Sequence, residues 1–203
     1  MLLLAALVLG GCSTPAMRPV PENPDAAWQQ RQLALATVGS WQLRARIALQ
    51  AGESGGQADL LWNQAQAAND LRLVGAWGRG LVRLQFDAGE ATLIDDNGVR
   101  HQGTDAADLL YQVTGWIIPV ASLRAWMVGL PVDAASASVV QIDAYGRLKT
   151  LEENGWRIEY EEYAEYDGRE LPKRLVLSQI RAMNGDARIT VRLVVTAWQV
   201  KQA

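Results

Sequence analysis

The chain has 203 residues, of which 49% are hydrophobic and 20% charged, and its 19 Lys and Arg against 22 Asp and Glu give a net charge of −3. This length and apolar fraction predict one globular domain with short appendages, and they exclude a disordered chain. The mild acidity argues against a nucleic-acid partner, which requires a basic surface. With a single His and a single Cys, the chain has little from which to build a metal site or a nucleophile–base pair. We therefore expect no cofactor and no enzymatic activity.

The N-terminal residues indicate export and lipidation. An unbroken apolar run over residues 1–9 precedes Gly10-Gly11-Cys12. The run is shorter than the roughly 20 apolar residues of a bilayer-spanning helix, and it is typical of a signal peptide. The small residues before Cys12 resemble a bacterial lipobox, which implies cleavage after Gly11 and diacylation of the Cys12 thiol. Ser13 in place of Asp is consistent with the outer membrane. We expect a signal peptide over 1–11 and a lipid anchor at Cys12; the alternative is an ordinary secretory signal with a chance cysteine.

A proline-rich tether is expected next. Residues 12–24 contain Pro15, Pro19, Pro21 and Pro24, and such a chain extends by about 3.1 Å per residue, so it reaches roughly 35–40 Å. The remaining residues, 25–203, are expected to form the single domain. Asn23 and Pro24 are typical of a helix N-cap and first helical position, which predicts a helix to Val38.

From Trp41 the hydrophobic period changes to two, which is typical of half-buried strands. Turn sequences such as Asn154-Gly155 and Asp167-Gly168 join successive strands as hairpins. About eleven strands and consecutive hairpins predict one antiparallel meander, curled or closed into a barrel. The predicted strands cover residues 41–49, 56–62, 69–74, 80–86, 91–95, 98–102, 138–143, 147–152, 156–163, 171–178 and 186–198.

The meander is interrupted once, over residues 103–131. Thr104 is expected to cap a helix that ends at Gly115, and residues 116–119 then cross in extended form. A second short helix ends at Gly129. The apolar faces of these helices are suited to cover the open side of a curved sheet. A sheet of more than about eight strands encloses more space than its own side chains fill, so either the helices plug the interior or a cavity remains.

Candidate catalytic motifs are weak. Gly52-Glu53-Ser54-Gly55-Gly56 matches the nucleophile-elbow pattern, but it lies between two predicted strands and therefore indicates a hairpin. His101 is expected to be an exposed strand residue. Glu and Tyr alternate over residues 159–167, which indicates a solvated strand face with Tyr packed beneath, although paired carboxylates also suit acid–base work on a sugar. Asp95-Asp96-Asn97 lacks the spacing of a calcium loop and indicates a turn.

One predicted hairpin tip is unusual because it is apolar. Gly75, Ala76, Trp77, Gly78 and Arg79 lie between two predicted strands, where polar residues are the rule. Trp77 either folds back onto the sheet or forms a probe for a membrane or partner, since Trp favours the water–lipid boundary.

The chain resembles the LolB family of outer-membrane lipoprotein receptors. No single motif is specific, but the order and spacing of several are, over about residues 28–200. The matching residues are Trp41, Arg44, Arg46, Trp62-Asn63-Gln64, Leu71-Arg72-Leu73, Gly115-Trp116, Pro119, Leu123, Trp126, Gly129-Leu130-Pro131, Gly155-Trp156, Tyr160, Leu171-Pro172 and Trp198.

This resemblance implies an α+β fold, mainly β: an unclosed antiparallel barrel with a helical lid, like that of the lipoprotein carriers. It also implies a cavity that takes the acyl chains of lipoproteins delivered by the periplasmic carrier LolA, and an exposed loop, here Gly75–Gly78, that passes cargo into the outer membrane. The usual Pro-Leu pair of that loop is Ala76-Trp77 in this chain. We expect a monomer facing the periplasm.

Seven residues are candidates for the cavity wall, and plain core packing is the alternative for each. They are Trp62, Leu73, Leu110, Trp116, Ile118, Trp126 and Met127. The other functions left open are a module that binds a free lipid or glycolipid, and a structural envelope lipoprotein.

Overall fold

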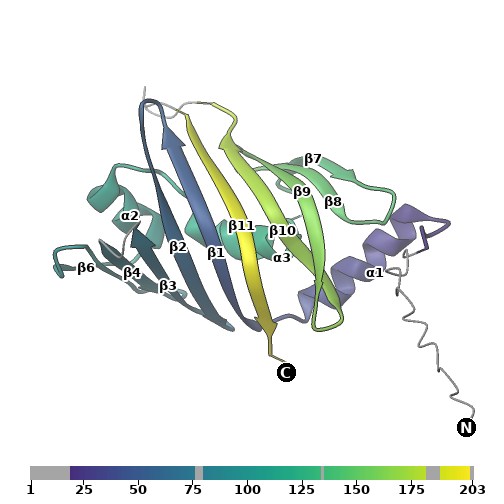
Figure 1. Ribbon diagram of the computed structural model, residues 1–203, viewed down its shortest axis with the longest axis horizontal. Coiled ribbons are helices and arrows are strands. Elements are labelled where there is room, and N and C mark those ends of the chain that lie inside the picture. Colours follow the sequence, from purple (N-terminus) through teal and green to yellow (C-terminus); the bar gives the residue numbers. More distant parts are fainter. Residues whose placement is uncertain (1–18, 76–79, 134, 182–187, 202–203) are drawn as a thin grey trace, which may run out of the picture.

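The computed structural model describes residues 19–75, 80–133, 135–181 and 188–201. In these residues it has three helices and eleven strands (Figure 1). The helices are α1 (Pro24–Ala36), α2 (Ala106–Thr114) and α3 (Val120–Val128). The strands are β1 (Ser40–Ala51), β2 (Ser54–Ala65), β3 (Ala68–Gly75), β4 (Leu81–Phe86), β5 (Ala91–Ile94), β6 (Arg100–Gly103), β7 (Ala137–Ile142), β8 (Leu148–Glu153), β9 (Trp156–Tyr166), β10 (Arg169–Gln179) and β11 (Ile189–Val200).

All eleven strands form one antiparallel sheet in the order β6-β5-β4-β3-β2-β1-β11-β10-β9-β8-β7. The first and last strands, β1 and β11, pair in the middle of the sheet, with Trp41 opposite Val200. Strands β6 and β7 are the two edges and do not pair with each other, so the barrel is unclosed. The predicted fold class is confirmed.

The alternation of side chains along the strands determines which face is buried. In β1, the side chains of Trp41, Leu43 and Ala45 are buried, whereas Arg44 and Arg46 are exposed. Successive side chains of a strand point to opposite faces, so one face of the sheet is apolar and the other is solvated. Strong right-handed twist then curls this long sheet around its apolar face.

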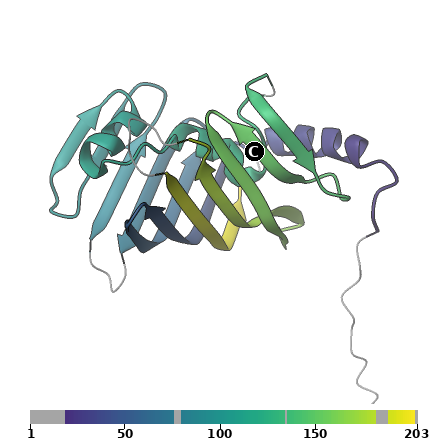
Figure 2. The ribbon, with the colours of Figure 1, turned by 90° about the horizontal axis from the view of Figure 1, so that it is seen from above.

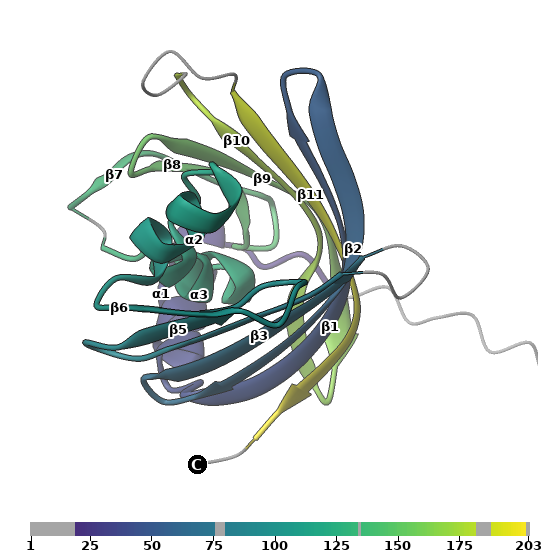
Figure 3. The same ribbon diagram turned by 90° about the vertical axis from the view of Figure 1, so that its left-hand side faces the viewer.

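The chain between the two edge strands supplies the lid. Helices α2 and α3 lie inside the curve of the sheet, across its open side (Figure 3). Leu109 and Leu110 of α2 and Met127 of α3 are buried. Both helices end, as predicted, at glycines in the left-handed conformation, Gly115 and Gly129. No helix among the described residues is long and apolar enough to span a bilayer.

Two helix boundaries differ from the prediction. The N-cap of α2 is Asp105 rather than Thr104, because the Asp105 carboxylate accepts hydrogen bonds from the N–H groups of Ala107 and Asp108 at 2.8 and 2.9 Å. Helix α1 ends at Ala36, two residues before the predicted Val38. Its N-cap is Asn23, as predicted; the Asn23 side chain accepts a hydrogen bond from the Ala26 N–H at 3.0 Å.

Helix α1 lies at the end of the molecule opposite α2 (Figure 2). Arg31 of α1 lies over the Tyr163 ring, with 5.3 Å between the guanidinium carbon and the ring centroid, and pairs with Glu170 at 3.9 Å. The turn at Gly146 contacts the first turn of the helix, since a Cβ at this position would lie 2.7 Å from the Ala27 Cβ. These contacts fix α1 against the hairpins of the C-terminal half.

Candidate functional site

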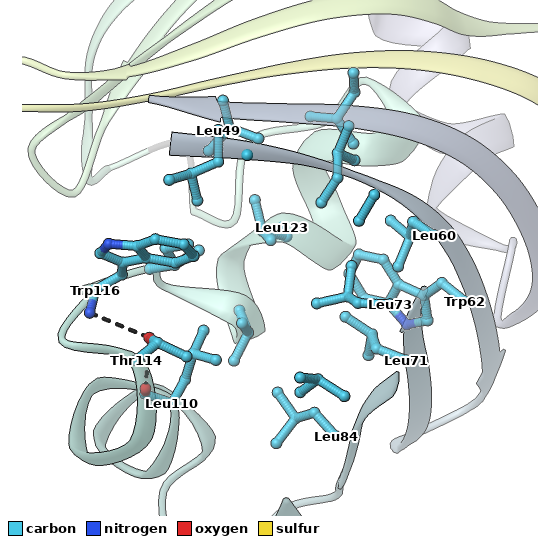
Figure 4. Close-up of a pocket in the computed structure, with 18 of the residues that line it drawn as sticks. Leu49, Leu60, Trp62, Leu71, Leu73, Leu84, Leu110, Thr114, Trp116 and Leu123 are labelled. Carbon is cyan, nitrogen blue, oxygen red and sulfur yellow. Dashed lines mark hydrogen bonds between the residues drawn. The ribbon is translucent and has the colours of Figure 1, made fainter. Parts of the chain in front are cut away.

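A cavity of about 280 Å³ lies between the concave face of the sheet and the lid (Figure 4). Strands β1 to β4 and β9 to β11 contribute to its wall, as do α2, α3 and the segment between them. Among the described residues that line it, Gln57 and Thr114 are the only ones with amide or hydroxyl side chains, and none is ionisable. This wall offers dispersion contacts to an apolar guest and no charge that the guest would have to desolvate.

Six of the seven candidates for the cavity wall lie along it: Trp62, Leu73, Leu110, Trp116, Ile118 and Met127. Trp126 does not. Its side chain is fully buried, and its indole N–H donates a hydrogen bond to the Glu153 carboxylate at 2.6 Å. Neighbouring residues of a helix point about 100° apart, so α3 directs Met127 to the cavity and Trp126 to strand β8. The assignment of Trp126 to the cavity was therefore wrong.

Several lining residues were not among the candidates. Leu49, Leu60, Leu71 and Leu84 occupy inward positions of β1 to β4 and line the cavity (Figure 4). The period-two pattern identifies these residues as inward-facing. It does not separate an inward residue that packs against the lid from one that faces an empty space, because that depends on where α2 and α3 lie.

At one end of the cavity the wall is Trp62, which is backed by two further tryptophans. The rings of Trp41 and Trp62 meet edge-on with 5.0 Å between their centroids, and Trp41 meets Trp198 in the same way at 5.1 Å. The indole N–H of Trp62 donates to the Asn69 side-chain oxygen at 3.1 Å, and that of Trp198 to the Pro172 carbonyl at 3.2 Å. Because both N–H groups are satisfied within the protein, the end wall is effectively apolar.

The other end of the cavity is open to solvent. At this open end the lining residues are exposed; they are Gly56, Gln57 and Gly80. At the closed end, Trp62 and Leu71 are buried. This mouth lies where β2 begins and β3 ends. The Gly75 N–H donates to the Gly80 carbonyl at 3.1 Å, which closes the base of the β3–β4 hairpin at the mouth. Gly75, the first residue of the predicted apolar tip, lines the cavity. The other predicted tip residues, Ala76, Trp77 and Gly78, lie outside the described residues, and so does the predicted lipid anchor Cys12.

A buried carboxylate holds the lid. Glu153 is 1% exposed and accepts hydrogen bonds from the Trp126 indole, the Val132 and Asp133 N–H groups and the Ser136 hydroxyl, at 2.6 to 3.0 Å. Burial raises the pKa of Glu153, but the four hydrogen bonds together outweigh burial, and the pKa lies below its usual value. Glu153 is therefore an ionised acceptor that ties the end of α3 to β8.

The weak catalytic motifs do not assemble into a site. Gly52 and Glu53 form the turn between β1 and β2, whose residues Ala51 and Ser54 pair. His101 lies on the edge strand β6, 35% exposed in its side chain, with its Nε2 2.9 Å from the Asp95 carboxylate. Hydrogen bonds from His101 and from the Val99 and Asn97 N–H groups lower the pKa of Asp95, which lies in the β5–β6 turn.

The acidic stretch is a solvated strand face. Glu159, Glu161 and Glu165 are exposed on β9, whereas Tyr160 is buried. Glu162 pairs with Lys173 at 2.7 Å. No group of three or more His, Cys, Asp or Glu in the described parts of the chain is arranged to hold a metal ion.

The fold and the site together define a class of protein: an unclosed antiparallel barrel whose helical lid encloses an apolar, uncharged cavity. The family model "Outer membrane lipoprotein LolB" matches residues 39–198, and the chain belongs to this family. LolB of Stutzerimonas stutzeri is 36% identical over 199 residues, which cover 97% of this chain and 93% of that protein. LolB of Pseudomonas aeruginosa PAO1 is 34% identical over 200 residues, covering 98% and 94%.

Two solved structures share the fold at low sequence identity. A LolA superfamily protein from Nitrosomonas europaea superimposes with a TM-score of 0.53 at 10% identity, over 85% of this chain and 94% of that one. A DUF1329 family protein from Desulfovibrio piger gives a TM-score of 0.52 at 6% identity, over 88% and 94%. Barrel and lid are thus the common framework of these proteins.

Proposed function

We propose that this chain is a receptor anchored in the outer membrane and facing the periplasm, which takes the acyl chains of lipoproteins into its cavity and inserts the lipoproteins into the membrane. The observation that carries this proposal is the uncharged apolar cavity of about 280 Å³ with a mouth at one end. Membership in the LolB family supports the location and the role in lipoprotein localization.

The energetics of acyl chains explain why a cavity is required. Each methylene buried from water contributes about 0.8 kcal/mol, so exposing three acyl chains would cost on the order of tens of kcal/mol. A mature lipoprotein therefore does not cross water freely, and its chains must pass from one apolar enclosure to another. The sequence has no phosphate-binding loop, so we propose that transfer runs downhill from weaker to stronger binding sites.

We propose the periplasmic carrier LolA as the donor. The fold shared with a LolA superfamily protein supports this, because two barrels of the same fold are suited to pass an acyl chain directly from one to the other. The acceptor acts as a monomer, attached by a lipid on Cys12 and by the tether of residues 12–24, after removal of residues 1–11. The domain of residues 25–203 then binds the acyl chains.

The tip of the β3–β4 hairpin is proposed to deliver the cargo. Gly75 and Gly80, at the base of this hairpin, both line the cavity at its mouth. In the sequence, Ala76, Trp77 and Gly78 follow Gly75 directly. An apolar segment beside the mouth is suited to contact the bilayer where the acyl chains leave the cavity.

Transfer into vesicles tests the proposal. Leu73 lines the cavity and is half-buried, whereas Leu33 on α1 is 73% exposed and lies outside it. The experiment presents a triacylated lipoprotein, in complex with LolA, to vesicles that carry the full chain. Leu73→Glu places a carboxylate among the acyl chains and should lower transfer at least tenfold, because a charge in an apolar site is costly. Leu33→Glu should transfer at the wild-type rate. Equal transfer by both variants would exclude the cavity as the binding site.

A further inference from the structure

The cavity is small for the cargo proposed above, so part of its wall has to move. Its volume is about 280 Å³, whereas sites that enclose a single drug-sized ligand occupy about 300–1,000 Å³. Three acyl chains carry many more carbons than such a ligand. The bonds between lid and sheet indicate which part of the wall moves.

Helix α3 is bonded firmly to the sheet. The Trp126 indole donates to Glu153, and the loop after α3 supplies the other three donors to this carboxylate. In addition, the Tyr160 hydroxyl donates to the Trp126 carbonyl at 3.0 Å in a buried position. Burial raises the pKa of Tyr160 well above its usual value, so this hydroxyl keeps its proton. Moving α3 would take the Trp126 donor from a buried carboxylate and the Trp126 carbonyl from the buried Tyr160 hydroxyl, which is costly because buried polar groups would lose their partners.

Helix α2 and the segment that follows it are held differently. The side-chain hydrogen bonds of α2 stay within the helix and its caps, as when the Thr114 hydroxyl donates to the Leu110 carbonyl. Contacts of α2 with the sheet are apolar, through residues such as Leu109. Among the described residues, a single side-chain hydrogen bond joins the segment of residues 115–119 to the sheet, and it comes from Gln179 of β10.

Gln179 has a buried side-chain amide whose NH₂ group and oxygen both form hydrogen bonds. It is 4% exposed; its Nε2 donates to the Ile117 carbonyl at 3.3 Å, and its Oε1 accepts from the Ile189 N–H at 3.0 Å. The bond to Ile189 fixes the orientation of the amide, so the NH₂ group points to the segment. The bond to Ile117, at 3.3 Å, is longer than the usual N–H···O distance of about 2.9–3.0 Å and is therefore weak.

The residues on either side of Ile117 form part of the cavity wall. Trp116 and Ile118 both line the cavity, and Gly115, with φ of +74°, separates them from α2. A glycine at a helix end is a position where the backbone direction changes with little steric cost.

We propose that residues 115–119 form a flap and that Gln179 is its latch: the bond to Ile117 keeps Trp116 and Ile118 against the cavity, and breaking it lets the wall open for acyl chains while α3 stays fixed. This proposal rests on the proposed function. Gln179 is a positioning residue, since it acts through the flap and does not line the cavity.

Amide hydrogen exchange of the full chain in nanodiscs, without lipid cargo, tests the latch. Gln179→Glu keeps an acceptor for the Ile189 N–H, but its ionised form has no donor for the Ile117 carbonyl. We expect exchange over residues 116–120 to rise about fivefold, the factor that corresponds to one net hydrogen bond, with no change over residues 125–128. Gln179→Met, which is uncharged, should raise exchange in the same region if the Glu variant fails to fold. Unchanged exchange over 116–120, or an equal rise over 125–128, would overturn the proposal.

A second readout separates the latch from a merely structural role. A photoactivatable triacyl lipopeptide added to the nanodiscs should label Gln179→Met about fivefold faster than the wild-type chain, because the flap no longer has to be released. Ser122→Ala, which removes an exposed lid–sheet contact to Asn154 at 3.4 Å, should label at the wild-type rate. Slower labelling of Gln179→Met would mean that Gln179 only supports the fold. If the wild-type chain is not labelled at all, the proposed function fails, whereas the exchange experiment still decides the latch.

Discussion

At the scale of single residues, Glu153 is a buried carboxylate whose charge is stabilised by four hydrogen bonds. Its four donors come from α3, from the loop after it and from Ser136. Gln in its place would turn an NH₂ group toward some of these donors. We predict that Glu153→Gln lowers the free energy of unfolding by about 2–3 kcal/mol at pH 7, measured by urea denaturation. Glu159→Gln, at an exposed position of β9, is the matched control and should change it by less than about 0.5 kcal/mol.

The contribution of Glu153 depends on pH in a definite direction. Its pKa in the folded chain lies below the ordinary value of 4.5. The carboxylate therefore stabilises the fold fully above about pH 4.5, and this stabilisation is lost as the pH falls through the lower folded-state pKa. We predict that the difference in unfolding free energy between the wild-type chain and Glu153→Gln shrinks between pH 5 and pH 3. A difference that grows toward acid pH would contradict the ionised acceptor.

Two neighbouring residues of the lid, Trp126 and Met127, have roles that the sequence alone does not separate. The sequence places both Trp126 and Met127 on an apolar helix, but their roles differ. Trp126 bonds to Glu153, which lies 27 positions along the chain, whereas Met127 faces the cavity. Nothing local to α3 distinguishes the two, because the distinction depends on the position of β8. For the same reason neither Glu153 nor Gln179 was foreseen.

At the scale of elements, α1 and the hairpin turn at Gly146 fit closely. Gly146 has φ of +70°, and a methyl group there would lie 2.7 Å from both the Ala27 Cβ and the Pro24 carbonyl oxygen. Gly155 has φ of +78° with nothing within 4 Å of such a methyl group. We predict that Gly155→Ala costs about 1 kcal/mol of unfolding free energy from backbone strain. Gly146→Ala should cost about 2–4 kcal/mol, because it also displaces α1.

Hydrogen exchange locates the extra cost of Gly146→Ala. Exchange should rise over α1 in this variant and stay at the wild-type level over β1 to β4. Equal stability losses in the two glycine variants would show that α1 does not depend on the Gly146 turn.

Most strands and helices can be predicted from the local pattern of the sequence. The alternation from Trp41 onward, and hairpin turns such as Asn154-Gly155, predict the eleven antiparallel strands that the structure contains. The period of two is strong because each strand has one buried and one solvated face. The N-cap of α2 was misplaced by one residue because Thr104 and Asp105 are both good caps, and only the backbone path decides between them.

At the scale of the whole molecule, two steps of transfer are assigned to different places. In the proposed function, acceptance depends on the cavity, and delivery depends on the tip of the β3–β4 hairpin. We predict that Trp77→Glu leaves capture of acylated cargo from the carrier unchanged and lowers its insertion into vesicles at least tenfold, because a carboxylate is unfavourable at the lipid boundary. Trp77→Phe should keep insertion near the wild-type rate. Unchanged insertion by Trp77→Glu would remove Trp77 from the mechanism.

The unclosed form of the barrel was expected from the resemblance to LolB, not from periodicity, which left a curled and a closed sheet equally open. Closure depends on whether β6 and β7 pair, which they do not, and the lid lies across the open side between them. The existence of a cavity is likewise a property of the assembled lid and sheet. Its residues share the inward face of the strands with ordinary core residues, as Leu49 does with Leu43 on β1.

The claim on which the rest depends is that acyl chains enter the space between sheet and lid. Photo-crosslinking tests it most directly: a triacylated lipoprotein with a photoactivatable group on its acyl chains is bound to the full chain, irradiated, and the adducts are located by mass spectrometry. We predict adducts on cavity-lining residues such as Leu71, Leu73 and Met127. Adducts confined to the outer face of the sheet, or to exposed residues such as Leu33, would contradict it.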